Sequence, residues 1–269
     1  MIGSDTSPGP AHIHAFDLET GRQRWAFPVG RGVLPAIVGS GGTAYAATTE
    51  HGVLALDVAS GKVRWSARLS ATGWERTALS GERIFTGASD GFLYALNART
   101  GATEWRTSLG DAVSTTVTVL DDAVYAGTAD GMFHRLDRHD GKVLAARKLD
   151  DKLRPRGSLA ATRTSLLVLL TDEAADYRAL VSVDAALNGV VWRQQPPDRW
   201  QTSRAHVWRN HIVLGTPTGE VLAYRVEDGA PAWSRTVRGR VRAIGSSSDT
   251  LYAGTTEGTL YALPAPEVP

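Results

Sequence analysis

The chain has 269 residues, no cysteine, and 29 Lys and Arg against 28 Asp and Glu, which gives a formal net charge of +1. So little net charge excludes a global field able to attract nucleic acid, and no nucleic-acid partner is expected. The lack of cysteine excludes disulfides, thiol nucleophiles, thiolate metal sites and a lipid-modified N-terminal cysteine. No apolar run approaches the ~20 residues that a membrane helix needs, so no membrane span is predicted.

The N-terminal segment, MIGSDTSPGPAHIH, has neither the basic leader nor the apolar core of a signal peptide. Its first residues, MIGSD, resemble the ends of VYAGTADG and LYAGTTEG later in the chain. This likeness predicts that the chain starts inside a strand of an earlier repeat. We therefore expect one domain over residues 1–269, truncated at its N-terminus.

One pattern recurs along the chain, as AFDLETGRQRW at 15–25, ALDVASGKVRW at 55–65 and ALNARTGATEW at 95–105. Its glycines are Gly21, Gly61, Gly101, Gly141, Gly189 and Gly229, at steps of 40, 40, 40, 48 and 40 residues. Such a period indicates a repeat architecture. The acid or amide is expected to accept turn N–H bonds, the glycine to supply a positive φ and the alanine to allow close packing. The tryptophans, at 25, 65, 105, 192 and 233, are expected to be buried against the adjacent repeat.

Each period contains four short β-type runs separated by turn residues, for example LPAIV, TAYAAT, VLALDV and VRWSARL. This spacing predicts an all-β propeller with four antiparallel strands in each blade. Innermost-type strands begin near Leu34, Arg76, Ser114, Arg156, Arg204 and Val241. They predict five complete blades flanked by two partial ones, about seven in total. A six-bladed ring closed by strand exchange between the termini is the alternative.

The spacing Ala-x-Asp-x-x-Thr-Gly-x-x-x-Trp resembles the tryptophan-docking motif of the pyrroloquinoline-quinone (PQQ) dehydrogenase propellers, over nearly the whole chain. The resemblance implies that the motif lies on the two outer strands of each blade and that the next innermost strand follows it. Some copies depart from the pattern. Ala145 replaces Trp, SVDAALNGVVW carries one extra residue and Arg225 replaces the acid.

The PQQ dehydrogenases are longer, and the resemblance to them implies a vicinal Cys pair, a Glu/Asn calcium site and an Asp base. This chain has no cysteine. It also resembles shorter relatives that use the repeats for binding: the propeller lipoprotein of the bacterial barrel-assembly machinery and sensor domains of bacterial Ser/Thr kinases. We predict a non-catalytic protein-interaction scaffold or ligand-sensing propeller with no catalytic residue and no cofactor. A PQQ-dependent dehydrogenase, or a fragment of one, is the alternative. An upstream export signal would favour the bacterial periplasm or cell exterior.

Two segments have residue types that bind metals. His12 and His14 share one face of a strand and would bind zinc if a third ligand came close, although exposed strand histidines are the favoured interpretation. The segment TDEAADYR, at 171–178, accounts for the 48-residue step. It lacks the glycine and the spacing of a calcium loop, so an acidic solvated loop is favoured over a calcium or partner site. No metal site is predicted.

Arginine recurs where the innermost strands begin, and turn or packing needs do not explain it. If those strands line a central channel, the guanidinium groups gather at one mouth of it, where an acidic peptide or a small anion would bind. The predicted binding residues are Arg76, Arg156, Arg204, Arg242, Trp74 and Trp200. Adjoining loops add Lys152, Arg154, Arg199, Arg238 and Arg240. The alternative is local pairing of each arginine with Glu75, Asp111, Asp150, Asp151 or Asp198.

Overall fold

The computed structural model describes residues 2–4, 11–17, 19–30, 33–48, 52–69, 77–162, 164–172, 178–195 and 205–264. These residues form strands β1 to β26, arranged in seven antiparallel sheets. Five of the sheets have four strands, and the first and last have three. The predicted all-β architecture with five complete and two partial blades is therefore confirmed. Within the described ranges there is no helix long and apolar enough to cross a membrane.

The chain forms two compact units, Met1–Arg147 and Lys148–Pro269. The first unit contains the sheets β1–β3, β4–β7, β8–β11 and β12–β15. Their strands are β1 (Ile2–Ser4), β2 (Ala11–Phe16), β3 (Gln23–Gly30), β4 (Val33–Ser40), β5 (Thr43–Thr48), β6 (Gly52–Asp57), β7 (Val63–Ala67), β8 (Ala78–Ser80), β9 (Arg83–Gly87), β10 (Phe92–Asn97), β11 (Thr103–Ser108), β12 (Thr118–Leu120), β13 (Ala123–Gly127), β14 (Met132–Asp137) and β15 (Val143–Lys148). A single domain over the whole chain stays a prediction.

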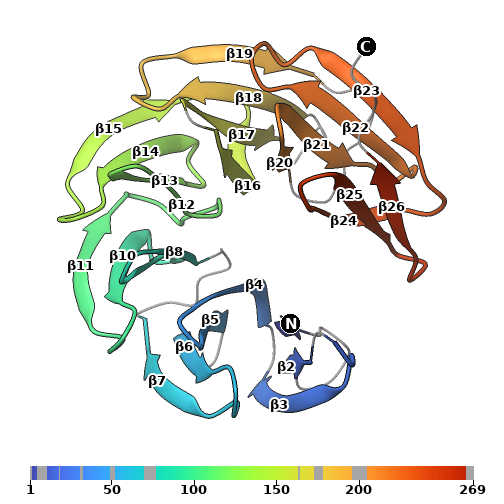
Figure 1. The fold of residues 1–269 in the computed structure, drawn as a ribbon. Helices are drawn as coiled ribbons and strands as arrows, with labels where there is room; N and C mark the ends of the chain where they lie inside the picture. Colours follow the sequence, from blue (N-terminus) through green and yellow to red (C-terminus); the bar gives the residue numbers. More distant parts are fainter. Residues whose placement is uncertain are drawn as a thin grey trace. The chain divides into compact units, whose positions relative to one another are not determined.

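The second unit contains the sheets β16–β19, β20–β23 and β24–β26. Their strands are β16 (Arg154–Ala161), β17 (Ser165–Thr171), β18 (Arg178–Asp184), β19 (Val190–Gln194), β20 (His206–Trp208), β21 (His211–Gly215), β22 (Glu220–Arg225), β23 (Pro231–Thr236), β24 (Val241–Ser246), β25 (Thr250–Thr255) and β26 (Leu260–Pro264). Within each unit, first strands of successive sheets contact one another, as β4 contacts β8 and β20 contacts β24. We call these the inner strands, and the last strand of each four-stranded sheet the outer strand (Figure 1).

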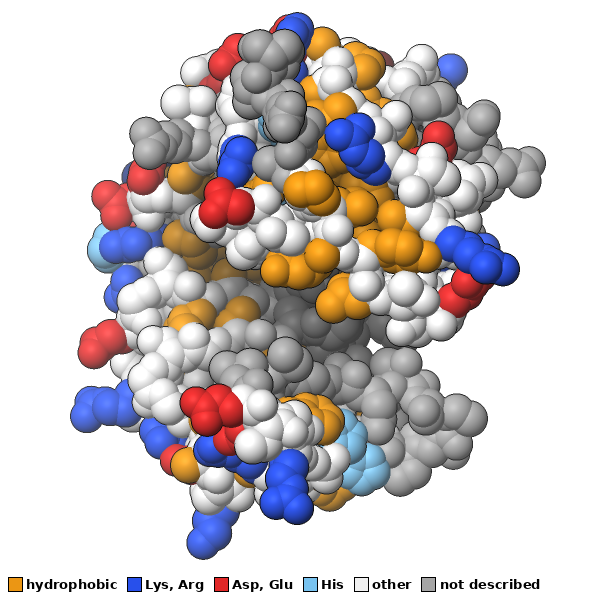
Figure 2. Space-filling model, turned by 45° about the vertical axis from the view of Figure 1, so that its right-hand side comes forward, with side chains coloured by type: hydrophobic (Ala, Val, Ile, Leu, Met, Phe, Trp, Pro, Cys, Tyr) orange, Lys and Arg blue, Asp and Glu red, His pale blue; other side chains and the backbone are white. Residues whose placement is uncertain are grey.

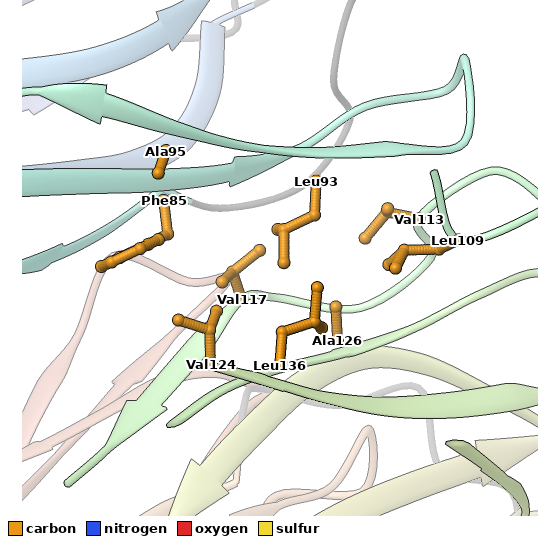
Figure 3. Packing of buried hydrophobic residues seen from close by; sticks show 9 residues of the cluster. All are labelled: Phe85, Leu93, Ala95, Leu109, Val113, Val117, Val124, Ala126 and Leu136. Carbon is orange, nitrogen blue, oxygen red and sulfur yellow. The ribbon is translucent and has the colours of Figure 1, made fainter. Parts of the chain in front are cut away.

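Burial changes across each sheet. In β5 every residue is buried, whereas the outer strand β11 alternates between exposed and half-buried residues. Apolar side chains of neighbouring sheets pack together, as Figure 3 shows for Phe85 and Leu93 of one sheet against Val124 and Leu136 of the next. Sheet faces covered on both sides explain why the middle strands have nearly continuous apolar sequences.

The repeated acid or amide makes the predicted turn contacts. The Asp57 carboxylate accepts a hydrogen bond from the Ser60 backbone N–H at 2.8 Å, and the Asn97 side chain accepts one from the Thr100 N–H at 3.1 Å. In five copies the following glycine has positive φ, as at Gly101 (74°). The copy with the extra residue differs from the prediction. There the left-handed residue is Leu187 (φ 63°), and Gly189 instead donates its N–H to Asp184.

In four of the five copies the tryptophan indole N–H donates a hydrogen bond to a carbonyl of the following sheet. The Trp65 indole N–H donates to the Ala98 carbonyl at 3.0 Å, and a Cβ placed on Gly101 would lie 2.6 Å from the Trp65 ring. The same pairing joins Trp25 to Val58, Trp105 to Arg138 and Trp192 to Val226. Trp233 packs in the cluster that includes Leu251 and Ala253 of the following sheet, and its ring lies edge-on against Trp208. Its indole nitrogen is buried and has no hydrogen-bond partner among the described residues.

Acid is expected to destabilise the fold through these turns. Hydrogen bonds from Arg64 and Ser60 lower the pKa of Asp57, and those from Arg225 and the Ala230 N–H lower the pKa of Asp228 from 3.8 to about 2. A carboxyl group with a lowered folded-state pKa stabilises the fold above its unfolded pKa and loses that contribution as the pH falls through the folded value. We therefore expect the melting temperature to decrease between about pH 4 and about pH 2.

A pH series of thermal melts on wild type and Asp57→Asn tests this expectation. Asn97 shows that an amide serves the same turn, so the variant should fold at neutral pH and show a shallower acid dependence. Because the Asp57–Arg64 pair is largely exposed, the difference should be small. An unchanged slope would show that this carboxylate does not contribute.

Candidate binding site

The loop between β23 and β24, together with the start of β24, presents three arginines in alternation with buried or half-buried residues. Arg238, Arg240 and Arg242 are exposed, while Val237 and Val241 on either side are buried. Alternate side chains of an extended segment point to opposite sides, so the buried valines orient the arginines outward.

Backbone hydrogen bonds hold this loop against two turns. The Val237 N–H donates to the Gly219 carbonyl at 2.8 Å, and the Thr256 N–H donates to the Arg240 carbonyl at 3.0 Å. Gly219 is required at this contact, because a Cβ there would lie only 2.3 Å from the Val237 carbonyl oxygen. The three arginines therefore project from a backbone fixed on both sides.

Described arginines differ in whether they have a carboxylate partner. Arg64 pairs with Asp57 at 2.6 Å and Arg193 with Asp150 at 2.5 Å. Across the ranges that the structure describes, Arg238, Arg240 and Arg242 form no ion pair and no side-chain hydrogen bond. We call these three residues the arginine loop.

The predicted site residues have different outcomes. Arg156 on β16 and Arg242 on β24 are both exposed. The other four, Arg76, Arg204, Trp74 and Trp200, lie outside the described residues. Convergence of the four arginines therefore stays a prediction. Thr115, which aligns with them in sequence, is fully buried and its hydroxyl accepts the Gly127 N–H at 2.7 Å, so that position serves packing.

Of the carboxylates proposed as local partners, Asp150 has a different role. It accepts the backbone N–H groups of Lys152 and Leu153, both at 2.8 Å, and pairs with Arg193 on β19. Burial alone would raise its pKa, but these hydrogen bonds lower the pKa of Asp150 overall. The ionised Asp150 carboxylate therefore stabilises the turn that precedes β16.

Neither metal hypothesis gains support from the described residues. The His12 and His14 rings lie 5.8 Å apart on β2, and His14 Nδ1 is 3.1 Å from the Gln23 side-chain oxygen. No group of three or more His, Asp or Glu side chains able to hold a metal ion occurs in the described part of the chain. Most of the acidic segment, residues 173–177, lies outside that part.

Sequence reasoning placed Arg242 in the site but left Arg238 and Arg240 in an adjoining loop. The available signal was the alternation in TVRGRVR, with an arginine at every second position. Only the structure shows that the valines of this segment are buried and that its arginines have no carboxylate partner among the described residues.

The sheets, the repeated turns and the docked tryptophans define a β-propeller of the PQQ-like class. Residues 10–162 and 176–266 match the family described as outer membrane protein assembly factor BamB, and the chain belongs to this family. A search of curated proteins finds no significant match.

Solved structures show the same fold. BamB from Moraxella catarrhalis is similar with a TM-score of 0.67 at 15% identity, over 97% of this chain and 96% of that one. The computationally designed protein Ika8 is similar with a TM-score of 0.75 at 13% identity, over 98% of this chain and 80% of that one. At such low identity these likenesses establish the propeller fold and leave the ligand open.

Proposed function

We propose that this chain is a non-catalytic scaffold that binds an acidic segment of a partner protein through arginines near the starts of its inner strands. The observation that carries the proposal is the arginine loop, whose three guanidinium groups are exposed without a carboxylate partner among the described residues. Membership of a family described as an assembly factor supports a protein as the partner.

The chemistry of the arginine loop favours carboxylates. A guanidinium group offers several N–H donors in a planar fork, which matches a carboxylate or phosphate in a bidentate arrangement. A small anion would use the same donors. In this proposal Arg156, Arg76 and Arg204 extend the basic surface, and Trp74 and Trp200 add apolar contact.

An acidic peptide should bind this surface and lose affinity when the arginines are removed. For Arg240→Ala/Arg242→Ala we expect roughly tenfold weaker binding of a fluorescently labelled glutamate-rich peptide, because each exposed ion pair contributes about 0.2–1 kcal/mol. Fluorescence anisotropy at low salt measures this change. Added salt should weaken wild-type binding, since the screening length shrinks to about 10 Å at 0.1 M.

The matched control is Arg22→Ala/Arg99→Ala, which removes the same charge from two exposed turn arginines that also form no ion pair among the described residues. Equal loss in both double variants would show a nonspecific charge effect and contradict the site. Competition by inorganic phosphate would indicate a small anion as the natural ligand. Turnover of an alcohol or sugar with added PQQ and calcium would instead support the dehydrogenase alternative.

A further inference from the structure

The last strand of each of the first three sheets has a bulge directly before the motif tryptophan. The register of β6 with β7 skips Arg64, that of β2 with β3 skips Arg24, and that of β10 with β11 skips Glu104. Each of these strands ends its sheet. A bulged residue is unpaired in the ladder and its side chain is re-aimed, so at a sheet edge its chemistry affects whether another strand can be added.

In these three sheets the bulge residue is charged and is held by an ion pair. Arg64 donates from its Nη2 to Asp57 Oδ2 at 2.6 Å, and Arg24 pairs in the same way with Asp17. In both cases the arginine follows the motif acid by seven residues. Glu104 pairs with an arginine of β9. Charged side chains at an edge strand are a common protection against strand addition, so these three edges are protected.

The outer strand β15 departs from this pattern. It ends its sheet and, among the described residues, pairs with β14 alone. Its motif acid, Asp137, accepts the His139 N–H at 2.7 Å as the other motif acids do in their turns, but the residue seven positions later is Leu144. Leu144 is 43% exposed, and Val143 beside it is 40% exposed. The edge of β15 therefore presents two apolar side chains where β3 and β7 have an arginine bound to the motif acid.

The charges along β15 are of one sign. The segment KVLAARK, at 142–148, has no Asp or Glu, and its Lys142, Arg147 and Lys148 are exposed. Neither lysine forms an ion pair with any residue that the structure describes. Exposed apolar side chains alone are ordinary, and Figure 2 shows them at the surface among Lys, Arg, Asp and Glu side chains. What distinguishes β15 is an apolar pair flanked by cations on an unprotected edge.

These charges argue against a second copy of β15 as the occupant. In antiparallel pairing centred on Ala145, Lys142 of each chain would lie opposite Lys148 of the other, and like charges directly opposite destabilise a sheet. Every other register still brings together two basic strands without an acid. An acidic strand would instead meet opposite charges. The outer strand β19 also exposes Val191, but its Arg193 is already engaged by a carboxylate, so the charge argument applies to β15.

We infer that the free edge of β15 binds an extended segment of a partner protein that has two neighbouring apolar residues flanked by acidic ones. The backbone of this segment pairs antiparallel with β15, and its apolar side chains cover Val143 and Leu144. Its carboxylates lie opposite Lys142, Arg147 and Lys148. This surface shares no residue with the arginine loop, and either proposal stands without the other.

The fluorescently labelled peptide EETVIVE is the probe. In antiparallel pairing it places a glutamate opposite each basic residue of β15, and its isoleucine and second valine opposite Leu144 and Val143. The same residues in the order EVETEIV place a glutamate opposite Leu144 and should bind at least about tenfold more weakly, because the apolar contact is lost. Fluorescence anisotropy gives both affinities, and added salt should weaken binding of the probe.

Leu144→Arg should protect the edge of β15 in the manner of β7, because it places an arginine seven residues after Asp137, as Arg64 follows Asp57. The substitution adds a positive charge, so long-range attraction alone would strengthen binding of the acidic probe. We expect instead at least about tenfold weaker binding with no loss of melting temperature. The matched control is Val63→Arg, which adds the same charge at an exposed position of β7 and should bind the probe no more weakly than the wild type does.

Two further measurements separate this surface from the arginine loop. Arg240→Ala/Arg242→Ala should bind EETVIVE as the wild type does, and Leu144→Arg should bind the glutamate-rich peptide as the wild type does. Hydrogen exchange of the β15 amides should slow when EETVIVE is added, because N–H groups at the free edge then pair with the peptide.

Several results would overturn the inference. They are absence of probe binding, equal affinity for EETVIVE and EVETEIV, equal binding by wild type and Leu144→Arg, and loss of probe binding in the arginine-loop variant instead. The last result would assign the probe to the arginine loop. A dimer of the free protein that dissociates in Leu144→Arg, measured by analytical ultracentrifugation, would show that a second copy covers the edge and would also overturn it.

Discussion

Trp65→Ala is expected to lower the free energy of unfolding by about 3 kcal/mol, near the lower end of the range for removing a buried aromatic side chain. The Trp65 ring covers Tyr45, contacts Gly101 and donates its indole N–H to Ala98 at 3.0 Å. All of these contacts are lost together. In the variant the Ala98 carbonyl loses the indole donor and can only hydrogen-bond to water. Chemical denaturation followed by circular dichroism measures the change.

Trp65→Phe separates the ring from the hydrogen bond. It keeps most of the apolar contact and removes the indole N–H, so the expected cost is about 1 kcal/mol, the usual net contribution of one hydrogen bond. If both variants were equally destabilised, the ring contact with the following sheet would contribute nothing. A wild-type melting curve for Trp65→Ala would exclude docking as a source of stability.

Gly101→Ala is the second large effect, with an expected loss of about 3 kcal/mol. The glycine has φ 74°, and a Cβ at this position would lie 2.6 Å from the Trp65 ring. The backbone conformation costs roughly 1–2 kcal/mol for a residue with a side chain, and overpacking adds about 1–3 kcal/mol. The ring would have to leave its position to admit the methyl group.

Gly81→Ala is the matched control, because Gly81 also has positive φ (59°) but no atom within 4 Å of the added Cβ. It should lose only the backbone contribution, about 1 kcal/mol. In the Trp65→Ala background, the cost of Gly101→Ala should fall to that of Gly81→Ala, since the two residues are in direct contact. Additive costs would contradict the docking account.

The repeat made much of the fold predictable. Asp57, Gly61 and Trp65 stand at fixed offsets, and their contacts are either local or reach the adjacent copy of the same motif. The residues that stabilise each turn could therefore be recognised within each copy of the motif. Counting inner-strand starts predicted five complete and two partial sheets, and the strand pairing confirms that count.

The binding surface was less predictable. Recurrent arginines suggested basic character, but whether an arginine is free depends on which carboxylate comes within about 4 Å, and turns distant in sequence decide that. Arg193 pairs with Asp150 across 43 residues, whereas Arg242 has no such partner among the described residues. The sequence could not separate these two cases.

By itself the sequence determined the strand period, the turn chemistry and the tryptophan-docking pattern, because these depend on residue type at short, repeated spacing. Tertiary structure decided the exceptions. Leu187 takes the left-handed conformation that the extra residue shifts away from Gly189, and Trp233 has no acceptor among the described residues, whereas Trp192 donates to Val226 of the neighbouring sheet. The physical reason is that a hydrogen-bond acceptor, a covering ring or a counter-charge must be brought close by packing, and identical motif residues differ in function when their neighbours differ.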